Sequence, residues 1–130
     1  MSTAYGFSKK LDAPYEQAKK KIIAALKEQG FGVLTEIDVK ATLKKKLDVD
    51  FRRYVILGAC NPPLAHQALS AELEIGLLLP CNVIVYETQD GGAVVSAMNP
   101  AAAMGIVDNP ALAEVAEQVT GKLQQAIDNS

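Results

Sequence analysis

Apolar side chains recur along the chain with a period of two in some segments and of three to four in others, which is typical of strands and helices respectively. Tyr5, Phe7 and Leu11 alternate with small or polar residues, as expected for a strand with one buried face. In residues 82–88 the apolar run is nearly continuous, which indicates a strand inside a sheet. The pattern predicts five strands, over residues 5–11, 31–38, 51–60, 82–88 and 93–98.

Two long amphipathic helices are predicted, one near each end of the chain. The first follows Asp12, which we interpret as its N-cap, has Pro14 in its first turn and ends at Gly30. The second begins at Pro110 and carries an apolar stripe, with residues three and four apart, that includes Leu123. Both stripes must be covered, and the economical arrangement places both helices on one face of the sheet.

Shorter segments connect these elements. A helix over residues 39–47, capped by Asp38, and another over residues 64–72 are predicted from apolar spacing and from the residues that precede them. Residues 89–92, Gln-Asp-Gly-Gly, predict a hairpin whose glycines adopt positive φ, so the last two strands should pair antiparallel. Residues 99–109, rich in small side chains, are expected to be irregular.

These elements predict a single domain over residues 1–130, of the α+β class, with a mainly antiparallel five-stranded sheet and two long helices packed on it in two layers. A length of 130 residues, 49% of them hydrophobic, suffices for one packed core. No long helix remains for the second face of the sheet. Because residues 83–86 do not alternate polar with apolar side chains, a second copy of the chain is expected to cover that face, and a homodimer is predicted.

Charge and hydropathy narrow the class of partners. A net charge of -2 and a pI near 5.4 argue against a general nucleic-acid binder, which would carry a basic excess. The longest apolar stretch, residues 75–85, is interrupted by Pro80 and Asn82 and is too short to span a bilayer, so no membrane partner is expected. Nothing in the first ten residues resembles a secretion signal, which predicts a cytoplasmic location where cysteines stay reduced.

Two short motifs with cysteine are distinctive. Residues 60–62 read Cys-Asn-Pro and residues 79–83 read Leu-Pro-Cys-Asn-Val, with the Asp-Gly turn at residues 90–91 after them. From about residue 31 to the last helix, the chain resembles the domain of unknown function family 302, an uncharacterised group found in bacteria and archaea. The resemblance implies a fold similar to the TATA-binding-protein-like fold, an antiparallel sheet with two long helices packed on it, often dimeric. It implies no activity.

The two cysteines are candidates for a thiol site. Cys60 ends a strand just before a helix N-terminus, whose partial positive charge favours a thiolate, and Cys81 begins the next strand. If these strands are antiparallel neighbours, both cysteines share one end of the sheet. If a parallel crossover joins the strands instead, the cysteines lie at opposite ends, about 20 Å apart. The alternative interpretation is that both are small buried side chains.

Three polar residues accompany the cysteines. His66, the single histidine, follows Cys60 by six residues, and such a pair can serve as nucleophile and base or as two metal ligands. A closed zinc site would need a further ligand such as a carboxylate, and a surface position for His66 is the competing interpretation, so metal binding stays open. Asn61 and Asn82 each follow a cysteine and are either part of a ligand-binding site or local backbone caps.

No phosphate-binding glycine loop, Ser-His-Asp order or dinucleotide fingerprint is present, and no cofactor is predicted. The first functional hypothesis is a non-enzymatic homodimeric module that binds a small apolar or amphipathic ligand or a partner protein. The alternative is a thiol-based redox or metal-binding protein that uses Cys60 and Cys81 with His66.

Overall fold

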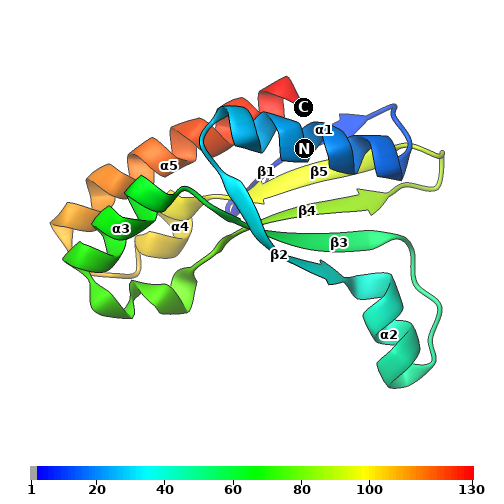
Figure 1. Cartoon of the computed structure of the whole chain (residues 1–130), viewed down its shortest axis with the longest axis horizontal. Coiled ribbons are helices and arrows are strands. Elements are labelled where there is room, and N and C mark those ends of the chain that lie inside the picture. Colours follow the sequence, from blue (N-terminus) through cyan, green and yellow to red (C-terminus); the bar gives the residue numbers. More distant parts are fainter. Residues whose placement is uncertain (1–2) are drawn as a thin grey trace.

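Five strands form one sheet in the computed structural model, which describes residues 3–130 (Figure 1). Their order is β1-β5-β4-β3-β2, and every neighbouring pair is antiparallel. The predicted α+β class with an antiparallel five-stranded sheet is therefore confirmed. The strands are β1 (Gly6–Leu11), β2 (Gly32–Asp38), β3 (Tyr54–Cys60), β4 (Cys81–Glu87) and β5 (Ala93–Met98).

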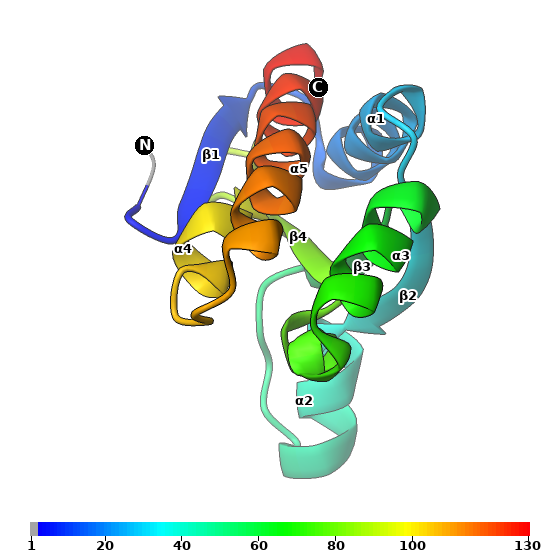
Figure 2. The ribbon, with the colours of Figure 1, turned by 90° about the vertical axis from the view of Figure 1, so that its left-hand side faces the viewer.

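The two long helices lie side by side on one face of this sheet, as the sequence pattern predicts (Figures 1 and 2). They are the first and the last helix of the chain, and their buried residues follow the apolar stripes read from the sequence. The helices are α1 (Tyr15–Glu28), α2 (Val39–Leu47), α3 (Pro62–Ala71), α4 (Pro100–Met104) and α5 (Pro110–Asn129), with a short 3-10 helix, η1 (Leu73–Leu78), after α3.

The start of α1 differs from the sequence-based interpretation. Pro14, in an extended conformation, occupies the N-cap position, and its carbonyl accepts the N–H of Ala18 at 2.9 Å. Asp12 lies two residues further upstream and makes no cap hydrogen bond, so its assignment as the N-cap is wrong. Proline has no N–H to satisfy and a φ compatible with the position, so the helix starts directly after it at Tyr15.

Two short helical segments were not expected. Residues 99–109 contain α4, which begins where the Asn99 side chain accepts the N–H of Ala101 and Pro100 follows in the first turn. The run of alanines after Pro100 sustains one turn of helix, so the expectation of an irregular segment is wrong for its first half. The second segment, η1, is only six residues long and has no helical apolar stripe in the sequence.

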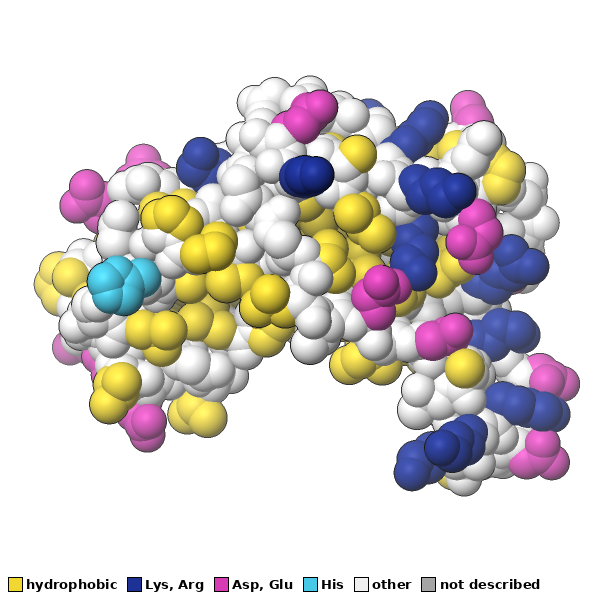
Figure 3. Space-filling view, in the orientation of Figure 1, with side chains coloured by type: hydrophobic (Ala, Val, Ile, Leu, Met, Phe, Trp, Pro, Cys, Tyr) yellow, Lys and Arg dark blue, Asp and Glu magenta, His cyan; other side chains and the backbone are white. Residues whose placement is uncertain are grey.

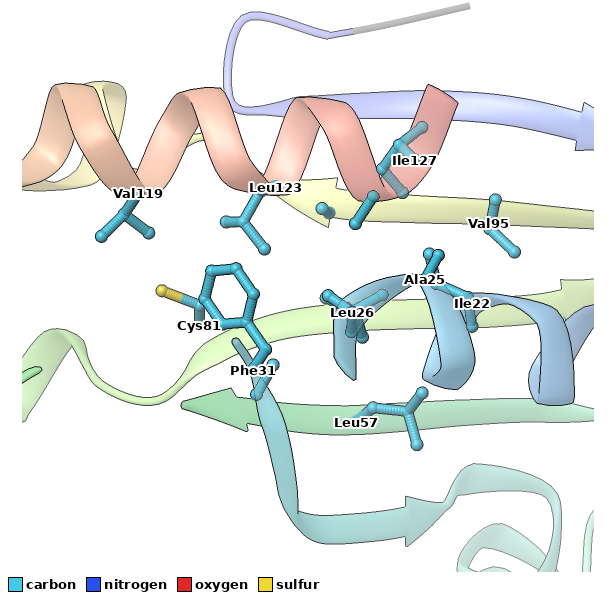
Figure 4. Close-up of a cluster of buried hydrophobic side chains, with 14 of the residues drawn as sticks. Ile22, Ala25, Leu26, Phe31, Leu57, Cys81, Val95, Val119, Leu123 and Ile127 are labelled. Carbon is cyan, nitrogen blue, oxygen red and sulfur yellow. The ribbon is translucent and has the colours of Figure 1, made fainter. Parts of the chain in front are cut away.

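Strand alternation divides the sheet into a covered and an open face. Val55, Leu57, Val83, Val85 and Val95 point towards α1 and α5 and are almost fully buried. Figure 4 shows part of this core, in which side chains of the two helices meet those of the central strands. The residues between them in the strands point to the other face, over which neither long helix lies (Figure 1).

In the hairpin between β4 and β5, only one of the two glycines predicted to have a positive φ has one. Gly91 has φ +83°, as a tight turn requires, and Asp90 stabilises the turn by accepting the N–H of Gly92 at 3.1 Å. Gly92 does not adopt positive φ, contrary to expectation. It is glycine-specific for another reason: a Cβ there would lie 2.6 Å from the carbonyl oxygen of Leu11 on the neighbouring strand.

Candidate functional site

A cavity of about 340 Å³ lies where β3 ends and β4 begins, between α3 and α5. Phe31 and Leu34 close it on the β2 side, Leu64 on the α3 side, and Met104 and Val119 from α4 and α5. Apolar side chains gather around a hollow at this end of the molecule (Figure 3). No lysine, arginine, aspartate or glutamate is among the lining residues, so the site is an apolar chamber rather than an ion-binding cleft.

Both cysteines border this cavity. Because β3 and β4 are antiparallel neighbours, Cys81 lies directly opposite Ala59, one residue before Cys60. The first of the two arrangements considered from the sequence, with both thiols at one end of the sheet, is the one observed. The parallel-crossover alternative is wrong, because the segment of α3 and η1 between the strands returns the chain to the same end. Cys60 is half-buried and Cys81 is buried.

The environment of Cys81 favours a neutral thiol. Only 5% of the residue is exposed, and its side chain lies beside those of Phe31 and Val119 (Figure 4). Burial, with a smaller contribution from the charge of a nearby Cys60 thiolate, raises the pKa of Cys81 from 9.0 to about 11. At neutral pH Cys81 is therefore protonated and serves as a small apolar wall of the cavity.

We expect iodoacetamide to modify the half-buried Cys60 at pH 8 and to leave Cys81 unmodified. The thiolate is the reactive form of a cysteine, and the raised pKa of Cys81 keeps its thiol neutral at this pH. Between pH 8 and pH 10 the rate at Cys81 should rise about tenfold per pH unit, since the thiolate fraction grows by that factor below the pKa. Mass spectrometry after cleavage at glutamate separates the two thiols at Glu72 and Glu74. Equal rates at pH 8 would contradict the burial of Cys81, and the single variants C60S and C81S identify each signal.

Asn61 is held in place by two hydrogen bonds at the rim of the cavity. Its Oδ1 accepts the N–H of Leu64 at 3.4 Å, which caps α3, and its Nδ2 donates to the carbonyl of Gln29 at 3.2 Å, which joins α3 to the end of α1. The residue is 8% exposed. Both ends of its amide are engaged, so Asn61 positions α3 over the cavity, as a cap interpretation predicts.

The other two candidate residues lie outside the cavity. His66 is exposed on α3 and is not among the lining residues. Asn82 points to the open face of the sheet, where it borders a depression with Ile84 and Tyr86, because its neighbour Cys81 points to the covered face. Within residues 3–130 no three His, Cys, Asp or Glu side chains are grouped closely enough to hold a metal ion. The five candidates therefore do not form one site.

Most residues that shape the cavity were not candidates from the sequence. Phe31 and Leu34 lie far from Met104 in the chain, and none of the three belongs to a chemical motif. The signal that was available is size: Ala59, Ala65 and Ala68 stand on facing elements, and small side chains there leave space that larger ones would fill. The sequence shows the small residues but not which elements face each other.

None of the helices in the part of the chain that the structure describes is long and apolar enough to cross a membrane. Among curated proteins, none matches the chain significantly. A crystal structure of an uncharacterized conserved protein DUF302 from Bacillus stearothermophilus is similar, with a TM-score of 0.89, 29% sequence identity and 98% of each chain covered. Residues 7–130 match the family described as domain of unknown function DUF302. The chain thus belongs to the DUF302 family.

Proposed function

We propose that the protein is a non-enzymatic binding module that holds a small apolar ligand in the cavity between α3, α5 and the end of the sheet. The observation that carries this proposal is the cavity itself: its volume of about 340 Å³ falls within the range of small-molecule sites, and apolar side chains dominate its walls. The walls belong to strands of the sheet and to helices such as α5 that pack in the same hydrophobic core.

Charge limits the class of ligand to neutral molecules. No lysine, arginine, histidine, aspartate or glutamate lines the cavity, and the chain has no lysine or arginine between Arg53 and Lys122, the stretch that supplies most of the walls. A carboxylate or phosphate inside this cavity would lose its hydration without gaining a cationic partner. A hydroxyl or carbonyl group of an amphipathic ligand has the Thr35 hydroxyl and the Cys60 thiol within the lining as polar neighbours.

A pair of probes tests both the site and the charge rule. We expect 1-decanol to slow the alkylation of Cys60 in a saturable manner and to displace the neutral dye Nile red. Decanoate, which differs at the head group, should need at least a tenfold higher concentration at pH 8 for the same effects. Equal potency of decanoate would overturn the restriction to neutral ligands, and failure of both probes to protect Cys60 would overturn the cavity as a ligand site.

A variant that fills the cavity supplies the matched control. Ala65 lines the cavity on α3, so Ala65→Leu should weaken decanol protection at least tenfold. Ala24 is exposed on α1, and Ala24→Leu adds the same atoms elsewhere and should leave protection unchanged. Equal effects of the two substitutions would place the ligand outside this cavity.

The rival function as a thiol redox or metal-binding protein has one observation in its favour, the shared position of Cys60 and Cys81 at the cavity. The raised pKa of Cys81 argues against this rival function, because a redox or metal-binding thiol acts as the thiolate. We also propose that the module works as a homodimer, since the open face of the sheet carries apolar side chains over which neither α1 nor α5 lies.

A further inference from the structure

Helix α2 projects from the end of β2 on the side of the sheet opposite α1 and α5, and Figures 1 and 2 both place it apart from the helical layer. None of its residues is buried. Of its apolar stripe, Val39 and Leu43 are half-buried, and α2 contacts β2 and β3, whereas Leu47 at its end is 65% exposed. A nine-residue helix is marginal in water by itself, so a packing partner that covered the exposed end of this stripe would stabilise it.

The open face of the sheet presents a matching apolar surface. Ile37, Ile56 and Ile84 lie in register across β2, β3 and β4, and the row continues through Ser96 and Ser8 to the far edge. Beside this row, the rings of Tyr54 and Tyr86 stack with centroids 5.5 Å apart. The surface is thus aliphatic and aromatic at its centre and polar at the β1 edge, which is the pattern of an interface core with a polar rim.

The two ends of the molecule carry opposite charge. Residues 1–60 contain 12 of the 13 lysines and arginines, including the four lysines of α2, whereas residues 61–130 contain only Lys122. At the opposite end α3, η1, α4 and α5 pack together, and these elements and the loops between them carry Glu72, Glu74, Asp108, Glu114 and Glu117 against the single Lys122. Figure 3 shows most of the dark blue side chains around α1 and α2, where magenta ones lie among them, whereas the far end shows mainly magenta ones.

We propose that α2 is an exchanged arm: in a two-fold dimer it lies against the open sheet face of a second copy, with the long axes of the two copies reversed. This inference rests on the proposed homodimer and specifies its interface. Of the two ways to stack the open faces about a two-fold axis, only the reversed one places the basic arm of each copy at the acidic end of the other. The other would place the lysines of α2 against their own symmetry copies.

Sedimentation equilibrium at micromolar concentration tests the arm. The wild-type chain should sediment at twice 13.8 kDa. Leu47→Asp should raise the dissociation constant at least tenfold, because it sets a carboxylate into the apolar contact, while the monomer has nothing to lose at a side chain so exposed. Ala24→Asp, an equally polar change at an exposed site on α1, should leave the dissociation constant unchanged.

Charge reversals test the orientation of the two copies. Lys45→Glu/Lys46→Glu on α2 should weaken the dimer, whereas Lys20→Glu/Lys21→Glu on α1, with the same change in net charge, should not. Mixing the α2 variant with Glu74→Lys/Glu114→Lys should restore association as a mixed dimer. Circular dichroism checks that each variant folds.

The outcomes separate the arm from the dimer and from ligand binding. A 13.8 kDa species at all concentrations would overturn both the dimer and the arm. A dimer that Leu47→Asp leaves intact would overturn the arm while the dimer stands. Protection of Cys60 by decanol is measured independently of association, so its failure bears on the cavity alone.

Discussion

Replacing Leu123 by alanine is expected to lower the free energy of unfolding by about 2–4 kcal/mol. The side chain is 0% exposed and points from α5 towards the sheet, between Val119 and Ile127 along the same stripe (Figure 4). Truncation removes buried methyl groups and leaves a void that the flanking helix and sheet cannot fully close. The loss is large because, within residues 3–130, α1 and α5 are the two long helices that cover this face.

Urea unfolding followed by circular dichroism measures this effect. Leu77→Ala is the matched control, since Leu77 is 82% exposed on η1 and the same truncation there should change the free energy of unfolding by less than about 0.5 kcal/mol. A loss below that value for Leu123→Ala would mean that α5 detaches without unfolding the sheet. The unfolding of α5 would then be visible as a separate, earlier transition.

Gly58→Ala is expected to cost about 1–3 kcal/mol, through overpacking rather than through a lost contact. A Cβ at this position would press against the Thr35 hydroxyl oxygen and lie 2.8 Å from Cγ of Pro80. The Pro80 ring is rigid, so it cannot yield without a shift of backbone, and the Thr35 hydroxyl would have to leave its present position. The strand pairing beside the cavity should therefore loosen.

Replacing a nearby glycine that is not crowded separates the effect of crowding from the general effect of removing a glycine. Gly32 in β2 has no atom within 4 Å of the added Cβ, so Gly32→Ala should change the free energy of unfolding by less than about 0.5 kcal/mol. In the double variant Thr35→Ala/Gly58→Ala the closest contact disappears, and part of the loss should be recovered. Equal unfolding energies for Gly58→Ala and Gly32→Ala would show that the site has room for a methyl group.

The cavity illustrates which part of the candidate site could be predicted. Cys60 and Cys81 were expected at one end of the sheet if their strands were antiparallel neighbours, and β3 and β4 are such neighbours. His66 was grouped with Cys60 because it stands six residues further along the chain, yet it lies on the exposed side of α3. Proximity in sequence does not tell which side of a short, weakly amphipathic helix faces inward, since that depends on the elements it packs against.

The sequence by itself determined those helices and turns whose caps, apolar spacing and end residues all lie within one short segment. Val39–Leu47 is a helix with Asp38 as its cap because the cap, the helical spacing and the stop at Asp48 are all encoded within that segment. The Asp90-Gly91 turn and the buried stripe around Leu123 follow for the same reason. Only the tertiary structure decided that α2 would stand away from the body and that Ala59 and Ala65 would face a common cavity. Those features depend on contacts between residues far apart in the chain, and a pattern with a period of two or four residues carries no information about them.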